Sequence, residues 1–219
     1  FVAAITQTGG QCRATNYLAL IKNAMRLAGF GDVKILSVNY GKALKNSQPG
    51  FRLGILKSVK ISMMSLVFAD AISEMYFACR AREKVLGSSK KTACHFAGRA
   101  AEFIKRLDFG GLFGLLREAV RAFNAIELSA CGVKKVGFIG EIYLKHNTFS
   151  HCGISEWLSQ RNIELVRPPL RNFVMQYFVN SAVNEKEHIS QMGVLKKLLS
   201  PLALKYMRSK IERAERIKA

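Results

Sequence analysis

The sequence has little of what usually completes a metal or nucleotide site. Its five cysteines are an odd number, lie far apart and include no CxxC pair. This usage argues against a disulfide framework and against a self-contained zinc site, and it favours a reducing, cytoplasmic setting. No phosphate-binding loop or other nucleotide motif is present. The cysteines are Cys12, Cys79, Cys94, Cys131 and Cys152.

Long apolar runs are also missing. The most apolar stretch, 61–72, contains Asp70 and is too short to cross a bilayer, so we expect no membrane span. The N-terminus has no basic region followed by an apolar region and a small-residue cleavage site, so secretion is not indicated. The chain begins without Met, inside a strand-like run, and we therefore expect a fragment of a longer protein.

Acidic residues are scarce. The chain has 15 Asp and Glu against 34 Lys and Arg, a formal net charge of +19. A basic surface attracts nucleic acid, acidic lipid headgroups or acidic protein partners. The cations are spread along the whole chain and do not alternate with aromatic side chains as in a base-stacking surface, so nucleic-acid binding is not the favoured role. With 219 residues and 49% hydrophobic content, the chain can still bury a core.

Residues 1–56 have the pattern of a βαβ unit. An apolar run at 1–5 leads into a Gly9-Gly10 turn, a helical pattern at 16–28 and a second strand pattern at 33–39. This order implies a parallel sheet with ligands at the carboxyl ends of its strands, which would lie side by side.

Cys12 is the candidate ligand in this turn. Gly9 and Gly10 permit a tight turn and close backbone approach. A thiol beside a helix start feels the positive end of the helix dipole, and Arg13 adds a nearby cation, so both favour the thiolate. A small buried thiol that only fills a glycine turn explains the same pattern.

The middle of the chain is expected to be helical and its end to be α/β. Apolar stripes at steps of three or four predict a helical layer over 57–130, in which Met64, Met75 and Cys79 are packing residues. Residues 131–219 are expected to begin a second α/β half, with a buried strand that ends at Gly140-Glu141. The remaining predicted elements are a helix at 154–160, a strand at 163–167, a polar turn at 184–187 and a basic helix opened by Ser200-Pro201.

A second loop carries the best local metal-type cluster, His146, His151 and Cys152. The spacing of its histidines suits neither one helix face nor a zinc knuckle, and a polar crossover loop explains these residues. Cys94 and His95 are adjacent, so they point in different directions on a helix and make a poor chelating pair.

Three stretches together resemble one family, the large acyl-CoA dehydratase activases of anaerobic bacteria, in the region related to 2-hydroxyacyl-CoA dehydratase subunits. The resemblance is colinear and runs through most of the chain. The stretches are Ile5-Thr6-Gln7-Thr8-Gly9-Gly10-Gln11-Cys12-Arg13-Ala14-Thr15-Asn16-Tyr17, Gln48-Pro49-Gly50-Phe51 and Val136-Gly137-Phe138-Ile139-Gly140-Glu141-Ile142-Tyr143-Leu144-Lys145.

The resemblance implies an α/β fold with two Rossmann-like, flavodoxin-like parallel-sheet halves, both partial here, joined by the helical layer. It implies an iron–sulfur protein, with a cubane cluster held between the halves by cysteine thiolates. Cys12 would be a ligand, Gly9 and Gly10 would give access, Arg13 would tune the charge, and Gly140 and Glu141 would line the opposing edge. The implied partners are dehydratase or activase subunits and an acyl-CoA substrate.

The chain departs from the family in two ways. It has no nucleotide motif, so ATP would act only through a module outside this chain. Only Cys12 falls in a family-like motif, whereas a cubane cluster needs about four thiolates, so further ligands would come from elsewhere and the fragment alone is expected to be inactive. The region 79–83 is altered in detail. The alternatives are a non-catalytic α/β interaction module that docks an acidic partner, and nucleic-acid binding.

Overall fold

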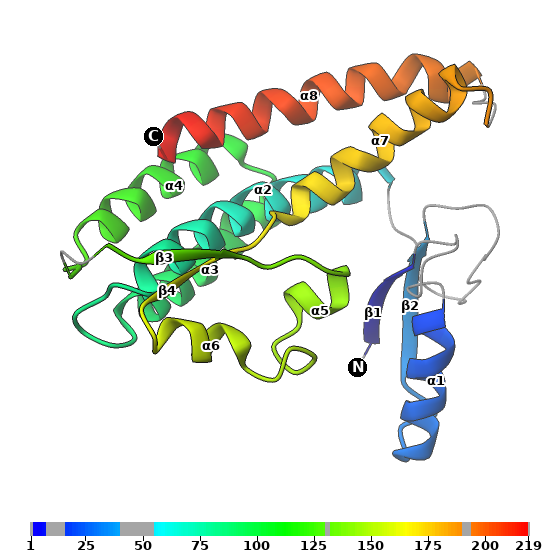
Figure 1. Ribbon diagram of the computed structural model, residues 1–219. Coiled ribbons are helices and arrows are strands. Elements are labelled where there is room, and N and C mark those ends of the chain that lie inside the picture. Colours follow the sequence, from blue (N-terminus) through cyan, green and yellow to red (C-terminus); the bar gives the residue numbers. More distant parts are fainter. Residues whose placement is uncertain (1, 8–15, 40–54, 130–131, 190–193, 219) are drawn as a thin grey trace. The chain divides into compact units, whose positions relative to one another are not determined.

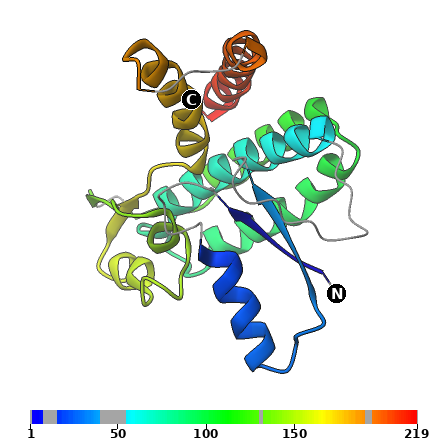
Figure 2. The same ribbon diagram turned by 90° about the vertical axis from the view of Figure 1, so that its right-hand side faces the viewer.

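The computed structural model describes residues 2–7, 16–39, 55–129, 132–189 and 194–218. The chain divides into two units, Phe1–Ile55 and Leu56–Ala219, and each is described by itself (Figures 1 and 2). Both units contain helices and a parallel pair of strands, so the chain has α/β character.

The first unit is the expected βαβ arrangement. Strand β1 (Val2–Gln7) pairs in parallel with β2 (Lys34–Asn39), and helix α1 (Tyr17–Leu27) connects them. Gln7 is the register partner of Asn39, so the carboxyl ends of the two strands lie side by side as predicted.

Helix α1 ends where the glycine pattern predicts. Gly29 has a φ of 81°, in the left-handed region. The Gly29 and Phe30 amides donate to the carbonyls of Arg26 and Met25, at 3.2 and 2.8 Å. These two bonds form a Schellman cap, which satisfies carbonyl groups that the end of a helix leaves open.

The second unit is built on three helices that match the predicted helical layer: α2 (Ile55–Arg80), α3 (Ser88–Lys105) and α4 (Phe109–Asn124). Their apolar stripes meet in one core, which α8 (Val194–Lys218) joins through Met207 and Ala214. Cys79 and Met64 are buried in this core and Met75 packs against it, which confirms their prediction as packing residues.

Two carboxylates accept hydrogen bonds from backbone amides at the starts of α3 and α4. Asp108 accepts a hydrogen bond from the Gly111 amide at 2.9 Å and so caps α4. Glu83 accepts from the amides of Gly87 and Ser89 at 2.8 and 2.7 Å at the start of α3. Burial raises the pKa of Glu83, but these hydrogen bonds outweigh it and the pKa lies below its usual value. The altered 79–83 region therefore has a structural role.

A second parallel pair follows the helices. Strand β3 (Lys134–Gly137) pairs with β4 (Ile163–Val166), and two short helices, α5 (Ile142–His146) and α6 (Ile154–Ser159), lie between them in sequence. Lys135 lies opposite Glu164 in this register and forms a 3.2 Å ion pair with it. On α6, Glu156 forms an ion pair with Arg80 of α2 at 3.1 Å. This contact connects α6 to the helical layer.

Three predictions about the second unit are wrong. Strand β3 is exposed along its length, because in the described residues its sheet has only two strands. Helix α5 occupies part of the stretch expected to be strand or loop. The polar turn expected at 184–187 is mostly helical, because α7 extends over Leu170–Lys186.

The final helix also starts earlier than predicted. Helix α8 begins at Val194, so Pro201 lies inside it and Ser200 is not its cap. A proline inside a helix removes one backbone hydrogen bond and disturbs the preceding turn. Beyond Pro201 the helix continues, and its residues Met207 and Ala214 are buried in the core.

Leu116 of α4 is 1% exposed in the core, so we predict that a cavity at this position strongly lowers the stability of the fold. Leu116→Ala should lower the free energy of unfolding by about 2–5 kcal/mol, since it removes buried methyl groups and leaves a void. Urea unfolding measures this. Leu86→Ala, at a side chain that is 89% exposed, is the control and should stay within about 0.5 kcal/mol of wild type. Equal losses in the two variants would contradict the packing.

Candidate functional site

A pocket of about 590 Å³ opens at the carboxyl ends of β3 and β4. Parallel strands direct the loops that follow them to one edge of the sheet, where α/β proteins bind ligands. Helix α2 and the start of α7 complete the walls. The lining residues are Asp70, Ser73, Glu74, Phe77, Ala78, Gly137, Phe138, Ile139, Glu164, Leu165, Val166, Arg167, Pro168 and Pro169.

Arg167 supplies a positive charge to this largely apolar pocket. Its guanidinium donates to Ser73 Oγ at 2.6 Å and to the Lys145 carbonyl at 3.2 Å. It also lies over the Phe77 ring, 5.0 Å from the centroid. Burial lowers the pKa of Arg167, and the nearby Asp70 carboxylate partly opposes this. An arginine fixed by these contacts can orient an anionic or carbonyl-bearing ligand against apolar walls.

The predicted edge residues Gly140 and Glu141 directly follow the loop that lines the pocket. Gly140 has a φ of 144°, which disfavours any residue with a side chain. Glu141 is exposed and stands at the start of α5 without capping it through its side chain. These two residues set the path of the chain from β3 into α5, and neither is among the residues that line the pocket.

The other predicted site residues, Gly9, Gly10, Cys12 and Arg13, lie outside the described residues, as does Cys131. Cys79 is buried, and desolvation raises the pKa of its thiol, so it does not favour the thiolate. Cys94 and Cys152 are exposed on separate elements. No group of three or more potential metal ligands occurs in the described part of the chain.

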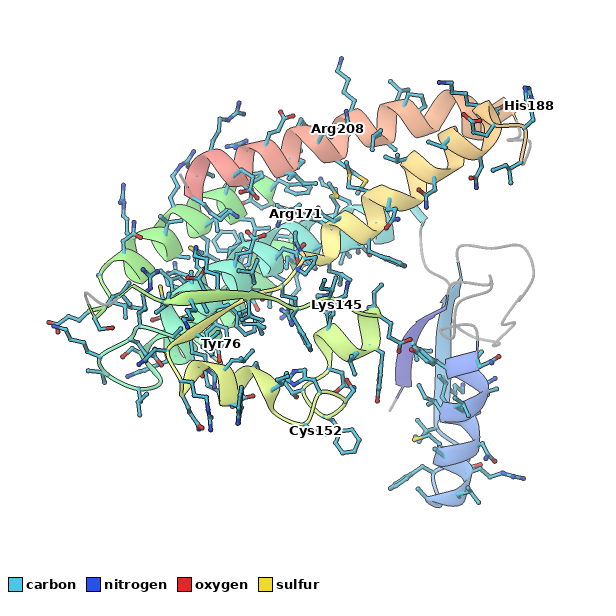
Figure 3. All side chains as sticks on the ribbon, viewed as in Figure 1. Tyr76, Lys145, Cys152, Arg171, His188 and Arg208 are labelled. Atoms are coloured by element: carbon cyan, nitrogen blue, oxygen red, sulfur yellow. The ribbon has the colours of Figure 1, made fainter. Side chains whose placement is uncertain are left out.

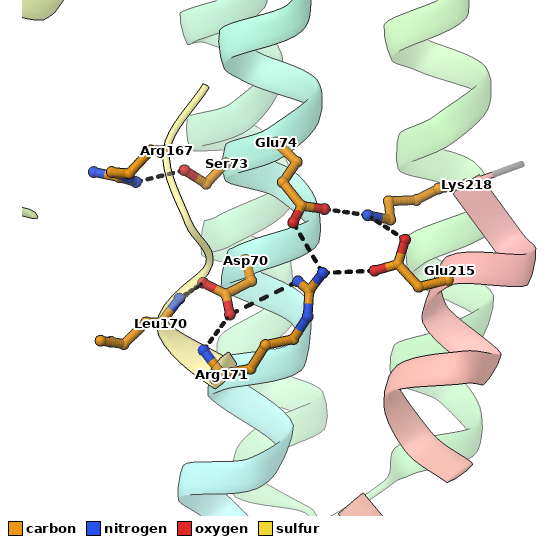
Figure 4. Close-up of polar contacts among 8 residues, drawn as sticks. All are labelled: Asp70, Ser73, Glu74, Arg167, Leu170, Arg171, Glu215 and Lys218. Atoms are coloured by element: carbon orange, nitrogen blue, oxygen red, sulfur yellow. Dashed lines mark hydrogen bonds and ion pairs between the residues drawn. The ribbon is translucent and has the colours of Figure 1, made fainter. Parts of the chain in front are cut away.

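A polar network forms the wall of the pocket on the side of α7 (Figures 3 and 4). Asp70 on α2 accepts hydrogen bonds from the Leu170 and Arg171 amides at 3.0 and 2.8 Å. Pro169, at the N-cap of α7, has no side-chain acceptor, so the carboxylate of another helix performs the capping. Burial raises the pKa of Asp70, and these two amides and the Arg171 charge lower it by less.

The guanidinium of Arg171 forms ion pairs with three carboxylates. Its Nη2 atom lies 2.9 Å from Glu74 and 2.7 Å from Glu215, and its Nη1 atom lies 3.8 Å from Asp70. Lys218 pairs with Glu74 and, at 2.9 Å, with Glu215 (Figure 4). The network therefore ties together α2, α7 and α8.

Sequence reasoning used Asp70 only as evidence against a membrane span. A usable signal was present, because Asp70 and Glu74 are four residues apart within an apolar helical stripe and so share one face. Two carboxylates on a buried face require cations from another segment. The sequence does not say which of its 34 basic residues those are.

By length and composition alone, helix α2 contains a stretch that could cross a membrane, Lys60–Arg80. Buried helices at the centre of a globular core also meet this criterion. In the second unit, Met64, Phe68 and Ile72 of this stretch are buried in the core, and Asp70 and Glu74 form the ion pairs with Arg171.

The second loop does not form a metal cluster among the described residues. His146 is half-buried beside Arg167, and desolvation, followed by the charges of Arg167 and Lys145, lowers its pKa to about 4. The His151 ring packs edge-on against Phe138, 5.7 Å between centroids, and its buried Nδ1 atom has no hydrogen-bond partner in the described part of the chain. The exposed Cys152 lies on the loop between α5 and α6 (Figure 3).

We predict that Asp70→Asn destabilises the protein by about 1–3 kcal/mol. The amide keeps one acceptor oxygen for α7 but removes the charge that faces Arg171. Urea unfolding at neutral pH is the measurement, and Glu127→Gln, at the exposed pair of Lys84 and Glu127, is the control. A loss no larger than that of the control would contradict the role of Asp70.

We predict that His146 stays neutral until the pH approaches about 4. Because its folded pKa lies below the unfolded value, the unfolded chain binds the proton first. The stabilisation from the neutral ring is present above about 6.5 and is lost as the pH falls toward 4. Titration by NMR measures this pKa, and Arg167→Gln should raise it. A wild-type midpoint near 6.5 would contradict the environment described.

The chain was compared with protein-family models, curated proteins and solved structures, and it matches none of them. A functional proposal therefore rests on the residues of this chain and on their arrangement.

Proposed function

We propose that this chain is part of an iron–sulfur protein related to 2-hydroxyacyl-CoA dehydratases and their activases. The observation that carries the proposal is the position of the family-like motifs. Gly9, Gly10, Cys12 and Arg13 follow β1, and Gly140 and Glu141 follow β3. In sequence, each set thus follows the first strand of a parallel pair, and α/β sheets bind ligands beyond the carboxyl ends of such strands.

In this proposal each strand pair belongs to a Rossmann-like half. Cys12 is one thiolate ligand, Gly9 and Gly10 leave room for the cluster, and Arg13 adds a positive charge beside it. Gly140 and Glu141 are the candidate lining residues of the second half. Such systems use ATP-driven, low-potential electron transfer to remove water from a 2-hydroxyacyl-CoA, and the cluster would supply the electron.

The described cysteines do not complete the ligand set. Cys79 is buried in the core, and the exposed Cys94 and Cys152 lie on α3 and on the loop before α6. A cubane cluster needs about four thiolates, so the remaining ligands would come from a partner subunit or from sequence beyond this chain. The proposal accordingly assigns this chain a component role and no activity of its own.

The pocket beside β3 and β4 suits a bound thioester in chemical terms. Its walls are mainly apolar, and the N–H groups of Arg167 can donate hydrogen bonds to a carbonyl oxygen or a carboxylate. We propose Arg167 as a positioning residue for the acyl group of the substrate.

The decisive experiment measures iron and acid-labile sulfide after anaerobic purification of the longest available form. Wild type is compared with Cys12→Ala and with the matched control Cys94→Ala, at an exposed thiol on α3. We expect iron in wild type and in the control, and its loss in Cys12→Ala. Iron that is unaffected by Cys12→Ala, or absent from all three forms, would contradict the proposal.

A non-catalytic interaction module is the second candidate. Lys205, Arg208 and Arg216 of α8 are exposed and form no ion pair among the described residues, so they are available to an acidic partner. Exposed charge contacts are screened by salt. Partner capture that is abolished in moderate salt, together with the absence of iron, would favour this function.

A further inference from the structure

A cluster of arginines lies where α8 packs on α4. Arg117 of α4 and Arg213 and Arg216 of α8 line an open pocket of about 500 Å³, and Ile217 completes the lining. None of these residues belongs to the pocket beside β3 and β4, so the cluster is a separate feature of the second unit.

The cluster ends a regular series of contacts between the two helices. Lys210 lies over the Phe109 ring, 5.2 Å from its centroid, and Arg213 lies over the Phe113 ring at 4.4 Å. Residue numbers rise in the same direction along both helices in these two contacts, so α4 and α8 run parallel. Phe109 and Phe113 are four residues apart on one face of α4, and the next residue at this spacing is Arg117. At this position a second cation replaces the aromatic ring that balances the charge at the two earlier steps.

Two nearby carboxylates form ion pairs with other cations. Glu118 pairs with Arg99 at 2.6 Å, and Glu215 pairs with Arg171 and Lys218. Among the described residues, no carboxylate forms an ion pair with Arg117, Arg213 or Arg216, although Glu212 is on the same part of α8. Three guanidinium groups thus line one pocket without an ion-pair partner among the described residues, and a bound anion would lower their mutual repulsion.

We propose that this pocket binds a phosphate-bearing small molecule. Each guanidinium presents a planar fork of donors that matches two phosphate oxygens, and side chains from two facing helices can engage separate phosphates of one ligand. The site is confined to one end of the α4 and α8 pair, with Ile217 as an apolar neighbour, which fits a compact oligophosphate better than an extended strand. The site goes beyond the proposed electron-transfer role.

The test is titration of the full chain with inorganic pyrophosphate by calorimetry, at about 0.15 M salt to screen general attraction. Arg117→Gln with Arg216→Gln removes two exposed members and leaves Arg213 on Phe113. Arg106→Gln with Arg208→Gln removes the same charge from exposed arginines outside the pocket. Arg117→Lys with Arg216→Lys keeps the charge and removes the forks.

We expect saturable 1:1 binding to wild type and to the control pair. Affinity should fall at least about tenfold in the Gln pair and by a smaller factor in the Lys pair, because charged hydrogen bonds are lost. Equal weakening in the control pair, or no saturable binding to folded wild type, would overturn the proposal. Binding of a single-stranded oligonucleotide to wild type that pyrophosphate does not displace would also overturn the proposal. The Lys pair tests the site if the Gln pair fails to fold.

Discussion

Arg171 places one guanidinium among three carboxylates from two helices, and the geometry of the second unit depends on that contact. Asp70 and Glu74 project from α2, Glu215 from α8, and the backbone of α7 begins at Leu170 against Asp70. A buried cation or carboxylate without its partners would cost several kcal/mol. The charges therefore connect α2, α7 and α8 in addition to the apolar packing of the core.

The pocket beside β3 and β4 follows from this arrangement. The short segment from Val166 to Pro169 runs directly from β4 into α7, and Asp70 holds the end of that segment through the Leu170 and Arg171 amides. Arg167 lies within the segment and is fixed by Ser73 of the same α2 helix. The residues that anchor α7 and the arginine that lines the pocket are thus held by contacts with α2.

The sequence predicted the elements better than it predicted their contacts. Periodic apolar stripes located α2, α3 and α4, and the strand–helix–strand order of the sequence patterns predicted both parallel pairs. Local patterns failed where tertiary packing decides. Pro201 looked like a helix start but lies inside α8, and β3 looked buried although Val136 is 41% exposed. Gly140 and Glu141 were predicted from a motif and lie next to the loop that lines the pocket, while Arg167 and Arg171 depend on long-range contacts that no local pattern encodes.

A double-mutant cycle between Asp70 and Arg171 tests the central structural claim most directly. The free energies of unfolding of Asp70→Asn, Arg171→Met and the double variant are compared with wild type. If the two residues depend on each other, Asp70→Asn costs much less once Arg171 is absent, with a coupling free energy of at least about 1 kcal/mol. Effects that add to within about 0.5 kcal/mol would contradict the account, because they would mean that the network does not hold α2 and α7 together.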